Sequence, residues 1–583
     1  MMYDTISSNL LTDANLQLSQ LLPESSFVEF DAHKLKNHRV VWSNPHNAPS
    51  FKLDDYAYCT PLASDSAKDY LDETKRYKAD RYGGVGIGPN GGGARCGLIG
   101  GVQVKGIGRN QLAGTETPFW HSYGGETVAG GVREAIWGEI CHFSLPYGGV
   151  RVHGIIDTGT SVPLFEANGN GEVTRRGLTL REAAIRPGHF VRSLFFSRKD
   201  EKLRQLCSDS ERTRRAIFCL GDTFQSTFGG NESNALNSSY INTCLKLMFS
   251  RFATQIAVGN VKRIIHGAIN ASNICLDGKW IDFGTISTIS DYGRIIINNT
   301  GPDVWEHSRV IKVASELIVS LRKYLPHTLA SKIIPLGELS NHFHIEFKKR
   351  VRIEFLKLTG IPECRLAKID EKSQLAFYDC IQKIISSGNK EPFKLYHPCP
   401  FYVAHMPDKM GDFHLNTIMK IVATCRNAEE ADRRLSIELT NQSLRKEFIF
   451  TFWNIKNAFL AQFNSTSIRN AWCFMAINCL RVNMNIPELY RHTLDKAINN
   501  FLISESDASL FINPLVNKAK TLLMDPVDRT LDLSDWFLGR ATLSLDTGFV
   551  INGSPIDFQI GVKKIKSGIL SANQIKELLV YGN

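Results

Sequence analysis

The stretch HGAINASNICLDGKWIDFG, residues 266–284, decides the fold that the sequence predicts. Asp277-Gly278 stands between two short apolar runs, and Asp-Gly in that position is a strong signal for a β-hairpin. The two runs are Ile274–Leu276 and Lys279–Ile281. Asn273 enters the hairpin and Asp282 leaves it, so the turn is expected to bring these two side chains together.

Asn273 and Asp282 are the predicted metal ligands of a kinase-like nucleotide site. An amide oxygen and a carboxylate that meet in this way are hard oxygen ligands, suited to Mg²⁺ (or Mn²⁺) held by nucleotide phosphates. Phe283-Gly284 completes the motif Asp-Phe-Gly. The alternative is a chance hairpin that binds nothing.

The start of the segment lacks the usual general base. Phosphotransferases of small molecules carry a His-Gly-Asp-x-x-x-x-Asn loop ahead of the final Asp, and here His266-Gly267 is followed by Ala268. A positioned base typically contributes roughly 100- to 10,000-fold to a rate. Ordinary transfer to a hydroxyl is therefore disfavoured, whereas binding of metal and nucleotide is not.

A glycine-rich segment, GGVGIGPNGGGARCGLIGGVQVKGIG at residues 83–108, lies upstream. Twelve glycines need a reason in backbone conformation or close approach, and backbone amides that converge on phosphate oxygens are one such reason. The alternation through Val102 and Val104 places Lys105 on a strand, where it can reach nucleotide phosphates. No Gly-Lys-Ser/Thr closes the segment, so it is not a Walker loop. The alternative is a glycine-rich hairpin with an exposed lysine.

A helix is predicted over Gly130–Leu145, GGVREAIWGEICHFSL. Its apolar residues Val132, Ile136, Ile140 and Phe143 lie on one helical face, and two glutamates, Glu134 and Glu139, lie off that stripe. A carboxylate on such a helix can form an ion pair with the strand lysine and fix its direction. Glu134, directly after Arg133, is the preferred partner. The alternative is a glutamate on a solvated surface.

Together, VQVKGIG (102–108) and HGAINASNICLDGKWIDFG (266–284) resemble the selenoprotein O family, over roughly residues 80–325. The resemblance implies a two-lobed protein-kinase-like fold of the α+β class, with a large helical region after it. It also implies that ATP binds in a flipped orientation and that AMP is transferred to protein hydroxyls.

The resemblance assigns roles position by position. The nucleotide-binding residues that it implies are Gly92, Gly93, Arg95, Lys105, Glu134, Arg181 and Arg186, with a two-residue gap needed for Arg181. Asn273 and Asp282 match the metal ligands, and Asp282 is also assigned to catalysis. Ser272 stands where the family has its catalytic aspartate.

Three departures from the family bear on activity. Ser272 and Ala268 occupy both places where a base is expected. The family's Asp-Gly before the helix is matched to Tyr123-Gly124 or Gly124-Gly125, so a nucleotide-contacting carboxylate is expected to be missing. The family's Cys-containing tail has no counterpart in the final LLVYGN.

Three functions follow from these expectations. The first is an ATP- and magnesium-dependent transferase that places AMP, rather than phosphate, on a protein or peptide hydroxyl. The second is a kinase-like subunit of a peptide-modifying complex, by analogy with bacteriocin or microcin maturation, in which a partner subunit completes the site. The third is a nucleotide-binding scaffold without chemistry.

The length of 583 residues predicts two to four domains. Glycine content and apolar periodicity differ along the chain and divide it into four parts. These are an N-terminal extension (1–75), a β-rich part (76–165), a part with the metal and nucleotide site (166–330) and a helical accessory region (331–583). A core helix is expected at Trp305–Leu325, before Pro326.

Charge and composition limit the classes of partner that the sequence predicts. The net charge of +10 is mild for this length, and no basic run with interleaved aromatics points to nucleic acid. No apolar stretch reaches the length of a membrane helix, and the N-terminus does not read as a secretory signal, so a cytoplasmic protein is expected. The thirteen cysteines are scattered and are expected to be reduced. Tyr396–Met410 holds two histidines and a cysteine, but it reads as a loop.

Overall fold

The computed structural model describes residues 18–63, 65–117, 122–163, 173–198, 206, 208–229, 236–290, 292, 295–297, 306–388, 393–395, 415–465, 467–504, 507–527, 529–534, 536–537, 540–545 and 547–555. The loop expected at Tyr396–Met410 lies outside these residues. All cysteines in the described part of the chain are free thiols.

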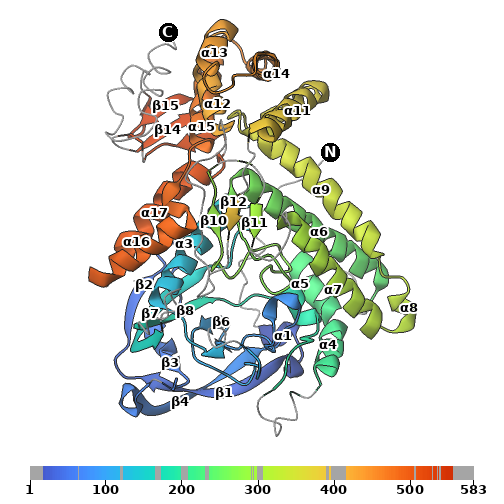
Figure 1. The fold of residues 1–583 in the computed structure, drawn as a ribbon, viewed down its shortest axis with the longest axis vertical. Helices are drawn as coiled ribbons and strands as arrows, with labels where there is room; N and C mark the ends of the chain where they lie inside the picture. Colours follow the sequence, from blue (N-terminus) through green and yellow to red (C-terminus); the bar gives the residue numbers. More distant parts are fainter. Residues whose placement is uncertain are drawn as a thin grey trace.

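An eight-stranded antiparallel sheet forms one end of the molecule, in the order β2-β7-β8-β6-β5-β4-β1-β3 (Figure 1). Its strands are β1 (Phe27–Leu35), β2 (Arg39–Ser43), β3 (Tyr58–Cys59), β4 (Tyr70–Asp80), β5 (Cys96–Ile99), β6 (Val102–Lys105), β7 (Val152–Pro163) and β8 (Val173–Glu182). The sheet therefore extends on both sides of the β-rich part expected at 76–165. Together with the helices, it makes the chain an α+β protein.

The β5–β6 hairpin places Lys105. Gly100 and Gly101 form its two-residue turn, and both have positive φ (57° and 81°), as the mirror-image turns of tight hairpins require. Lys105 is the last residue of β6 and pairs with Cys96 on β5 and Thr179 on β8. The lysine expected on a strand beside glycine turns is there, and it is buried rather than exposed.

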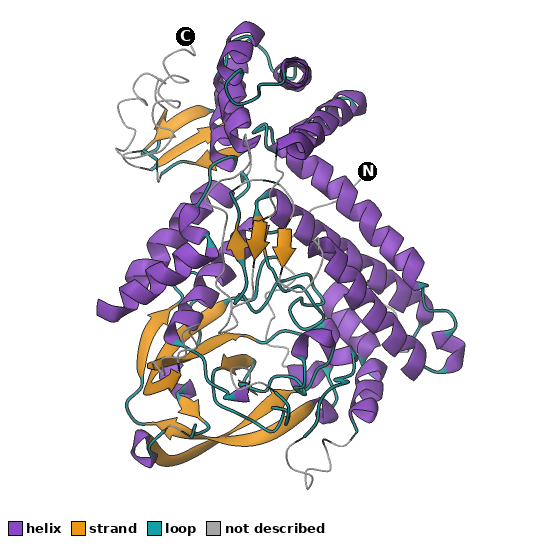
Figure 2. Ribbon diagram, in the orientation of Figure 1, coloured by secondary structure: helices purple, strands orange, loops and turns teal. Residues whose placement is uncertain are grey.

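Helices make up most of the rest of the described chain (Figure 2). They are α1 (Leu18–Leu21), α3 (Val128–Ser144), α4 (Asp209–Phe218), α5 (Leu220–Phe228), α6 (Ser238–Val261), α7 (Arg309–Tyr324), α8 (His327–Ala330), α9 (Leu336–Lys357), α10 (Glu363–Leu366), α11 (Glu371–Gly388), α12 (Leu415–Thr424), α13 (Ala428–Leu435), α14 (Gln442–Leu460), α15 (Ile468–Val482), α16 (Arg491–Ser504) and α17 (Ser509–Leu523). The core helix expected at Trp305–Leu325 is α7, which ends one residue before Leu325 and Pro326.

The described residues also form eight short strands outside the large sheet. They are β9 (Ile264–Ile265), β10 (Ser287–Thr288), β11 (Ile295–Ile297), β12 (Phe393–Leu395), β13 (Thr530–Asp532), β14 (Ala541–Ser544), β15 (Gly548–Ile551) and β16 (Ser554–Pro555). The last four form a separate antiparallel sheet, so the C-terminal region is not purely helical. None of the helices in the described ranges is both long and apolar enough to cross a membrane.

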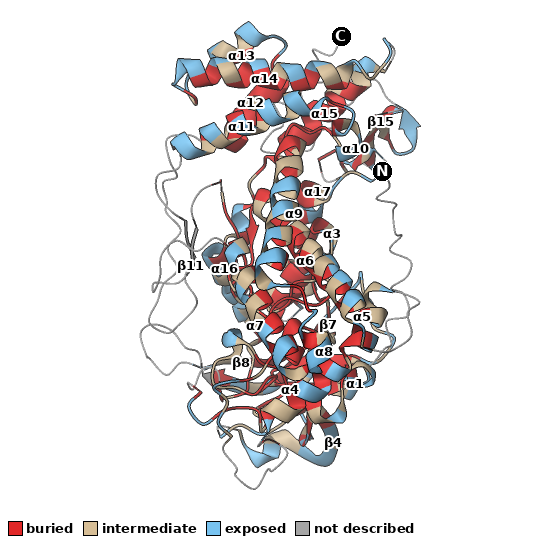
Figure 3. Ribbon diagram, turned by 90° about the vertical axis from the view of Figure 1, so that its right-hand side faces the viewer, coloured by how far each residue is buried: buried red, intermediate tan, exposed pale blue. Residues whose placement is uncertain are grey.

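Helix α3 is the predicted helix at Gly130–Leu145, extended by two residues at its start. The side chain of Thr127 caps it by accepting a 2.8 Å hydrogen bond from the amide of Gly130. The sheet strands β7 and β8 pack on one side of α3, and α16 and α17 pack on another. Residues off its apolar stripe are consequently buried as well, including Glu134 and Glu139. Buried residues also occur along α6, in the middle of the molecule (Figure 3).

Helix α6 leads into residues 266–284, the segment that contains Asn273 and Asp282. It is 24 residues long and is followed by β9, and β9 pairs in antiparallel fashion with β10. Residues 266–286 are the connection between these two strands, so both of its ends are anchored in one small ladder. Asn273 and Asp282, the two predicted metal ligands, both lie in this connection.

Candidate functional site

Lys105 is the centre of a cluster of charges that brings together four parts of the chain. Its Nζ forms an ion pair with Glu134 on α3, lies 3.2 Å from Glu126 Oε2 and donates a 3.1 Å hydrogen bond to Asp282 Oδ1. Arg95 lies 3.3 Å from the same oxygen of Glu126. The predicted ion pair between Lys105 and Glu134 is present, and two further carboxylates join it.

Burial and charge act in opposite directions on Lys105. Burial disfavours the protonated amine, but the carboxylates of Asp282, Glu126 and Glu134 outweigh this effect and raise the pKa of Lys105 above its usual range. Lys105 is thus a permanent positive charge in the cluster. A buried cation whose orientation is fixed by ion pairs with carboxylates is suited to bind an anion.

Asp282 is the most accessible carboxylate in the cluster, with 39% of its side chain exposed. Burial of its surroundings raises its pKa, but the charges of Lys105, Arg95 and Arg181 outweigh this and hold the pKa far below the usual range. Its backbone has a φ of +67°, a left-handed conformation that costs energy in a residue other than glycine. Such strain often marks functional positions.

Glu126 is a carboxylate of the cluster that was not predicted from the sequence. It follows Gly124-Gly125, and its Oε2 lies near both Lys105 and Arg95. An acidic residue directly after two glycines and before the helix was the available signal in the sequence.

Asn273 and Ser272 belong to a loop that is bound to itself. Asn273 Nδ2 donates to the carbonyl of Ala268 at 3.0 Å, and Asn270 Oδ1 accepts from both the amide and the hydroxyl of Ser272, at 2.8 and 2.6 Å. Ser272 is 5% exposed. Its hydroxyl proton is already donated to an amide oxygen, so Ser272 is not arranged as a base.

The hairpin after this loop is shorter than expected. Only Ile274 and Trp280 form a bridge, although the turn at Asp277-Gly278 is present. Two hydrogen bonds join its strands, from the backbone amide of Cys275 to the carbonyl of Lys279 at 2.9 Å and from that of Ile281 to the carbonyl of Asn273 at 3.3 Å. The reciprocal bond from Asn273 is absent, because its backbone amide donates to the carbonyl of Asn270 at 3.1 Å instead.

A buried carboxyl group fixes the turn at the start of the loop. Glu306 Oε1 accepts a 2.7 Å hydrogen bond from the amide of Gly267, whose φ is +81°. Glu306 is 2% exposed. Burial raises the pKa of Glu306 to about 7, against the opposing effect of hydrogen bonds from the amides of Gly267 and His266. The residue was not singled out from the sequence.

Arg181 and Arg186 lie behind the cluster rather than on its exposed side. Arg181 donates to Glu134 Oε2 and to Gln103 Oε1, both at 2.9 Å. Arg186 donates to the carbonyl of Ser272 at 2.9 Å, and its guanidinium stacks on the ring of Tyr82. Both arginines are nearly inaccessible, at 3% and 2% exposure. They orient Glu134 and the Ser272 loop.

Three residues that sequence analysis missed extend this buried network. Asp80 accepts a 3.3 Å hydrogen bond from Gln103 Nε2 and lies 3.3 Å from His189 Nε2. Gln103 in turn accepts from Arg181 and, at 3.4 Å, from Arg186. No sequence signal marks these residues, because their partners come from distant parts of the chain.

The glycine-rich segment packs against protein backbone. The φ of Gly92 is +138°, and a Cβ there would lie 2.3 Å from the carbonyl oxygen of Asp80. Gly93 donates from its amide to that same carbonyl, and a Cβ at Gly86 would lie 2.3 Å from the side chain of Asn270. Close approach of the chain to itself therefore accounts for these glycines. Arg95 and Lys105 are the members of this stretch that belong to the charge cluster.

The donor set fits a magnesium ion bound with a nucleotide. In the described residues, no group of three or more His, Cys, Asp and Glu side chains is arranged to hold a metal by itself. Magnesium with a nucleotide needs only one or two protein ligands, because phosphates and water supply the rest. The partly exposed carboxylate of Asp282 meets that need. Asn273 uses its amide nitrogen on Ala268, and its Oδ1 has only a 3.3 Å contact with the hydroxyl of Ser272.

Comparisons of the chain with protein-family models and with curated proteins found no match.

Proposed function

We propose that the chain binds ATP together with Mg²⁺ or Mn²⁺ and transfers AMP to a hydroxyl of a protein or peptide. The fold proposed with this function is protein-kinase-like, of the kind found in the selenoprotein O family. One observation carries the proposal. A strand lysine, Lys105, meets a helix carboxylate, Glu134, and the carboxylate of Asp282 from the Asp-Phe-Gly motif, 177 positions away in the sequence.

This arrangement has the charges that a metal–triphosphate complex requires. Lys105 and Arg95 supply positive charge for phosphate oxygens, and Asp282 supplies a hard oxygen for the cation. Asp282 accepts a hydrogen bond from Lys105 through Oδ1. When Asp282 binds a cation instead, this hydrogen bond is lost and the Lys105 amine becomes available to the phosphates. The ion pair with Glu134 keeps the amine near its present position.

In the proposed reaction, the acceptor oxygen forms a bond to the α-phosphorus while the bond from that phosphorus to the bridging oxygen breaks. Pyrophosphate leaves, and the hydroxyl proton passes to water. A bound divalent cation would neutralise part of the triphosphate charge and assist departure of pyrophosphate. Lys105, held by Glu134, would orient the phosphates.

A second candidate is a nucleotide-binding protein without chemistry, alone or as a subunit of a peptide-modifying complex. The observation that favours it is the Ala268–Asn273 loop. Ala268 has no acidic group, and Ser272 donates its proton to Asn270. A partner protein would then have to supply a base.

Parallel labelling with α-³²P and γ-³²P ATP distinguishes the candidates. AMP transfer predicts α-label on an acceptor protein, a kinase predicts γ-label, and a scaffold predicts Mg²⁺-dependent thermal stabilisation by ATP without label. Asp282→Ala should abolish both label and Mg²⁺ dependence. Asp54→Ala is the matched control, because Asp54 is exposed and pairs with His38 outside the cluster.

Ser272→Asp tests the missing base directly. A gain of label in Ser272→Asp would indicate that the chain keeps the nucleotide site and lacks only this group. The whole proposal fails if ATP with Mg²⁺ neither binds nor stabilises the wild-type chain.

A further inference from the structure

Helix α3 is held from outside the sheet by the C-terminal part of the chain. Arg133 on α3 forms an ion pair with Asp495 on α16, and these side chains are only 17% and 29% exposed. Arg133 directly precedes Glu134, which holds Lys105. Any rotation of α3 that broke the outer pair would also move Glu134.

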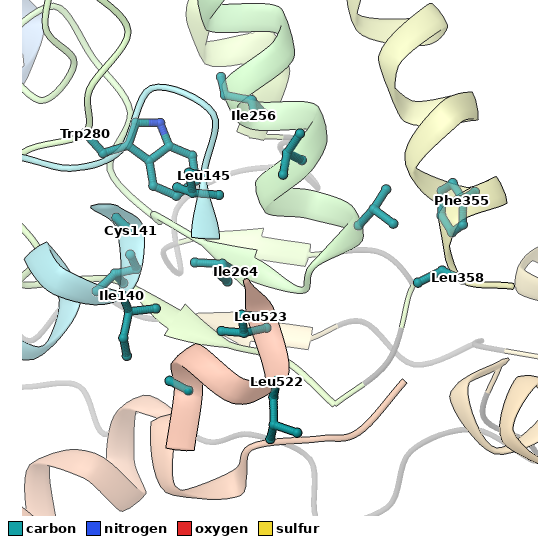
Figure 4. Close-up of a cluster of buried hydrophobic side chains, with 14 of the residues drawn as sticks. Ile140, Cys141, Leu145, Ile256, Ile264, Trp280, Phe355, Leu358, Leu522 and Leu523 are labelled. Carbon is teal, nitrogen blue, oxygen red and sulfur yellow. The ribbon is translucent and has the colours of Figure 1, made fainter. Parts of the chain in front are cut away.

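Apolar contacts supplement this ion pair. Figure 4 shows Leu522 and Leu523 of α17 in one cluster with Ile140 and Cys141 of α3 and Ile264 of β9. Both leucines are almost fully buried, at 4% and 6% exposure. Apolar side chains of α17 therefore cover part of α3 as well.

The same two helices are attached to the sheet that carries Lys105. The amide of Ala508 donates to the carbonyl of Val41 next to α17, at 2.9 Å. Arg175 on β8 donates to the carbonyl of Leu502 at the end of α16, at 3.4 Å. The C-terminal helices therefore span from α3 to the sheet, and they fix one relative to the other.

The segment just before α16 holds the chain downstream of Asp282. The hydroxyl of Ser287 on β10 accepts from the amide of Arg491 at 3.0 Å, and Thr288 donates to the carbonyl of Ile486 at 3.3 Å. Ser287 is five residues after Asp282. The stretch 482–525 thus contacts both elements whose side chains meet at Lys105.

We infer that residues 482–525 are a built-in brace that sets the geometry of the nucleotide site, with Asp495 as a positioning residue for the Lys105–Glu134 pair. The inference rests on the proposed function for its consequence in ATP binding. Its structural part, the dependence of Lys105 on the brace, stands without a nucleotide.

The test uses the full chain and two readouts. The first is the rate at which an amine-reactive acetylating reagent modifies Lys105 without nucleotide, followed by mass spectrometry. The second is the affinity for ATP with Mg²⁺. In Asp495→Lys, repulsion from Arg133 should raise the labelling rate of Lys105 severalfold and weaken ATP binding about tenfold, which corresponds to about 1.4 kcal/mol.

Two variants control for general effects. Asp495→Glu keeps the charge and should restore wild-type labelling and binding. Glu488→Lys reverses a charge in the same region, where Glu488 pairs with the exposed Lys518, and it should change neither readout. If Asp495→Lys does not fold, Asp495→Asn should show the same changes to a smaller degree.

The outcomes separate the brace from the proposed function. Unchanged labelling of Lys105 in folded Asp495→Lys and Asp495→Asn overturns the brace. Increased labelling in a chain that binds no ATP supports the brace and contradicts the proposed function.

Discussion

Glu306 and His266 illustrate how single buried groups fix the candidate site. His266 lies between the rings of Trp280 and Phe283, and its Nε2 donates to the carbonyl of Ile281 at 3.0 Å. Burial lowers the pKa of His266 to about 4, so its ring is neutral at pH 7. Glu306 binds the turn next to it. Neither residue touches Lys105, yet both set the path of the loop that ends at Asp282.

Glu306 predicts a dependence of stability on pH. Its pKa rises from 4.5 in the unfolded chain to about 7 in the fold. The folded state therefore binds the proton more tightly, and stability is lost as the pH rises from 4.5 to 7. Glu306→Gln keeps an acceptor for the amide of Gly267 without this titration. The variant should gain about 3–4 kcal/mol over the wild type across that range, since one pKa unit corresponds to about 1.4 kcal/mol.

The difference between the two proteins, measured by urea unfolding at each pH, isolates Glu306. His266 acts in the opposite direction, because its lowered pKa costs stability as the pH falls below 6.5, but it contributes equally to both proteins. A difference that stays constant between pH 4.5 and 7 would contradict the assignment.

Glu126 predicts a change in anion binding. Its carboxylate offsets the charges of Lys105 and Arg95 in the absence of ligand. Glu126→Gln should tighten the binding of metal-free ATP about 3- to 10-fold, because removal of a nearby negative charge favours an anion. Isothermal calorimetry in EDTA measures this. The exposed Glu116 provides the control Glu116→Gln, which should bind as the wild type does. Weaker binding by Glu126→Gln would indicate that Glu126 is needed to hold the two cations in place.

At the scale of elements, local signals placed the helix and the strands of the site well. The apolar stripe of α3 predicts a helix, and Gly100-Gly101 forms the turn before β6. Local signals did not predict that the hairpin at Asp277-Gly278 would reduce to one bridge. The backbone amide of Asn273 donates to the carbonyl of Asn270, and the carbonyl of Ile281 accepts from His266 Nε2, so these two groups do not bond to each other across the hairpin.

Replacement by alanine should have opposite effects on stability at two glycines, Gly92 and Gly221. Gly92→Ala should lower stability by about 2–4 kcal/mol, because the positive φ and the 2.3 Å contact with the carbonyl of Asp80 leave no room for a Cβ. Gly221→Ala, inside α5 with no atom within 4 Å of the new Cβ, should raise stability by about 0.5–1 kcal/mol. Thermal unfolding of both variants measures this. Similar shifts in both would contradict the role of close packing at Gly92.

At the scale of the whole molecule, ion pairs join the C-terminal region to the helices behind the site. Asp525 lies 3.0 Å from Lys262, which follows α6, and 2.9 Å from Lys357 at the end of α9. The two lysines are mostly buried, at 12% and 14% exposure. Lys262 also donates to the carbonyls of Ser144 and Leu523. It therefore links α3, α6 and α17.

Asp525→Asn predicts a loss of stability at this junction. Two lysines would lose a shared partner, and we expect a cost of about 1 kcal/mol after allowance for the exposure of Asp525. Lowering of the pKa of Asp525 means that its contribution is present above pH 3.8 and lost at lower pH. Chemical unfolding at pH 7 measures the cost. Glu488→Gln, which breaks an exposed pair with Lys518, should cost close to nothing, and an equal loss in both variants would contradict the junction.

The sequence by itself determined the strand that carries Lys105, the helix that carries Glu134 and the turn between Asn273 and Asp282. These follow from apolar periodicity and turn chemistry, which act between neighbours in the chain. It did not determine that Glu126 joins the cluster, or that Asp80, Gln103 and His189 support it.

Only the tertiary structure decided those points, and it also decided the burial of Glu134. Side chains off the apolar stripe of a helix face solvent unless another element covers them. Here α16 and α17 cover α3, from more than 350 residues away (Arg133 and Asp495 are 362 positions apart). No local pattern encodes such a contact, because it depends on how parts of the chain that are distant in sequence pack together.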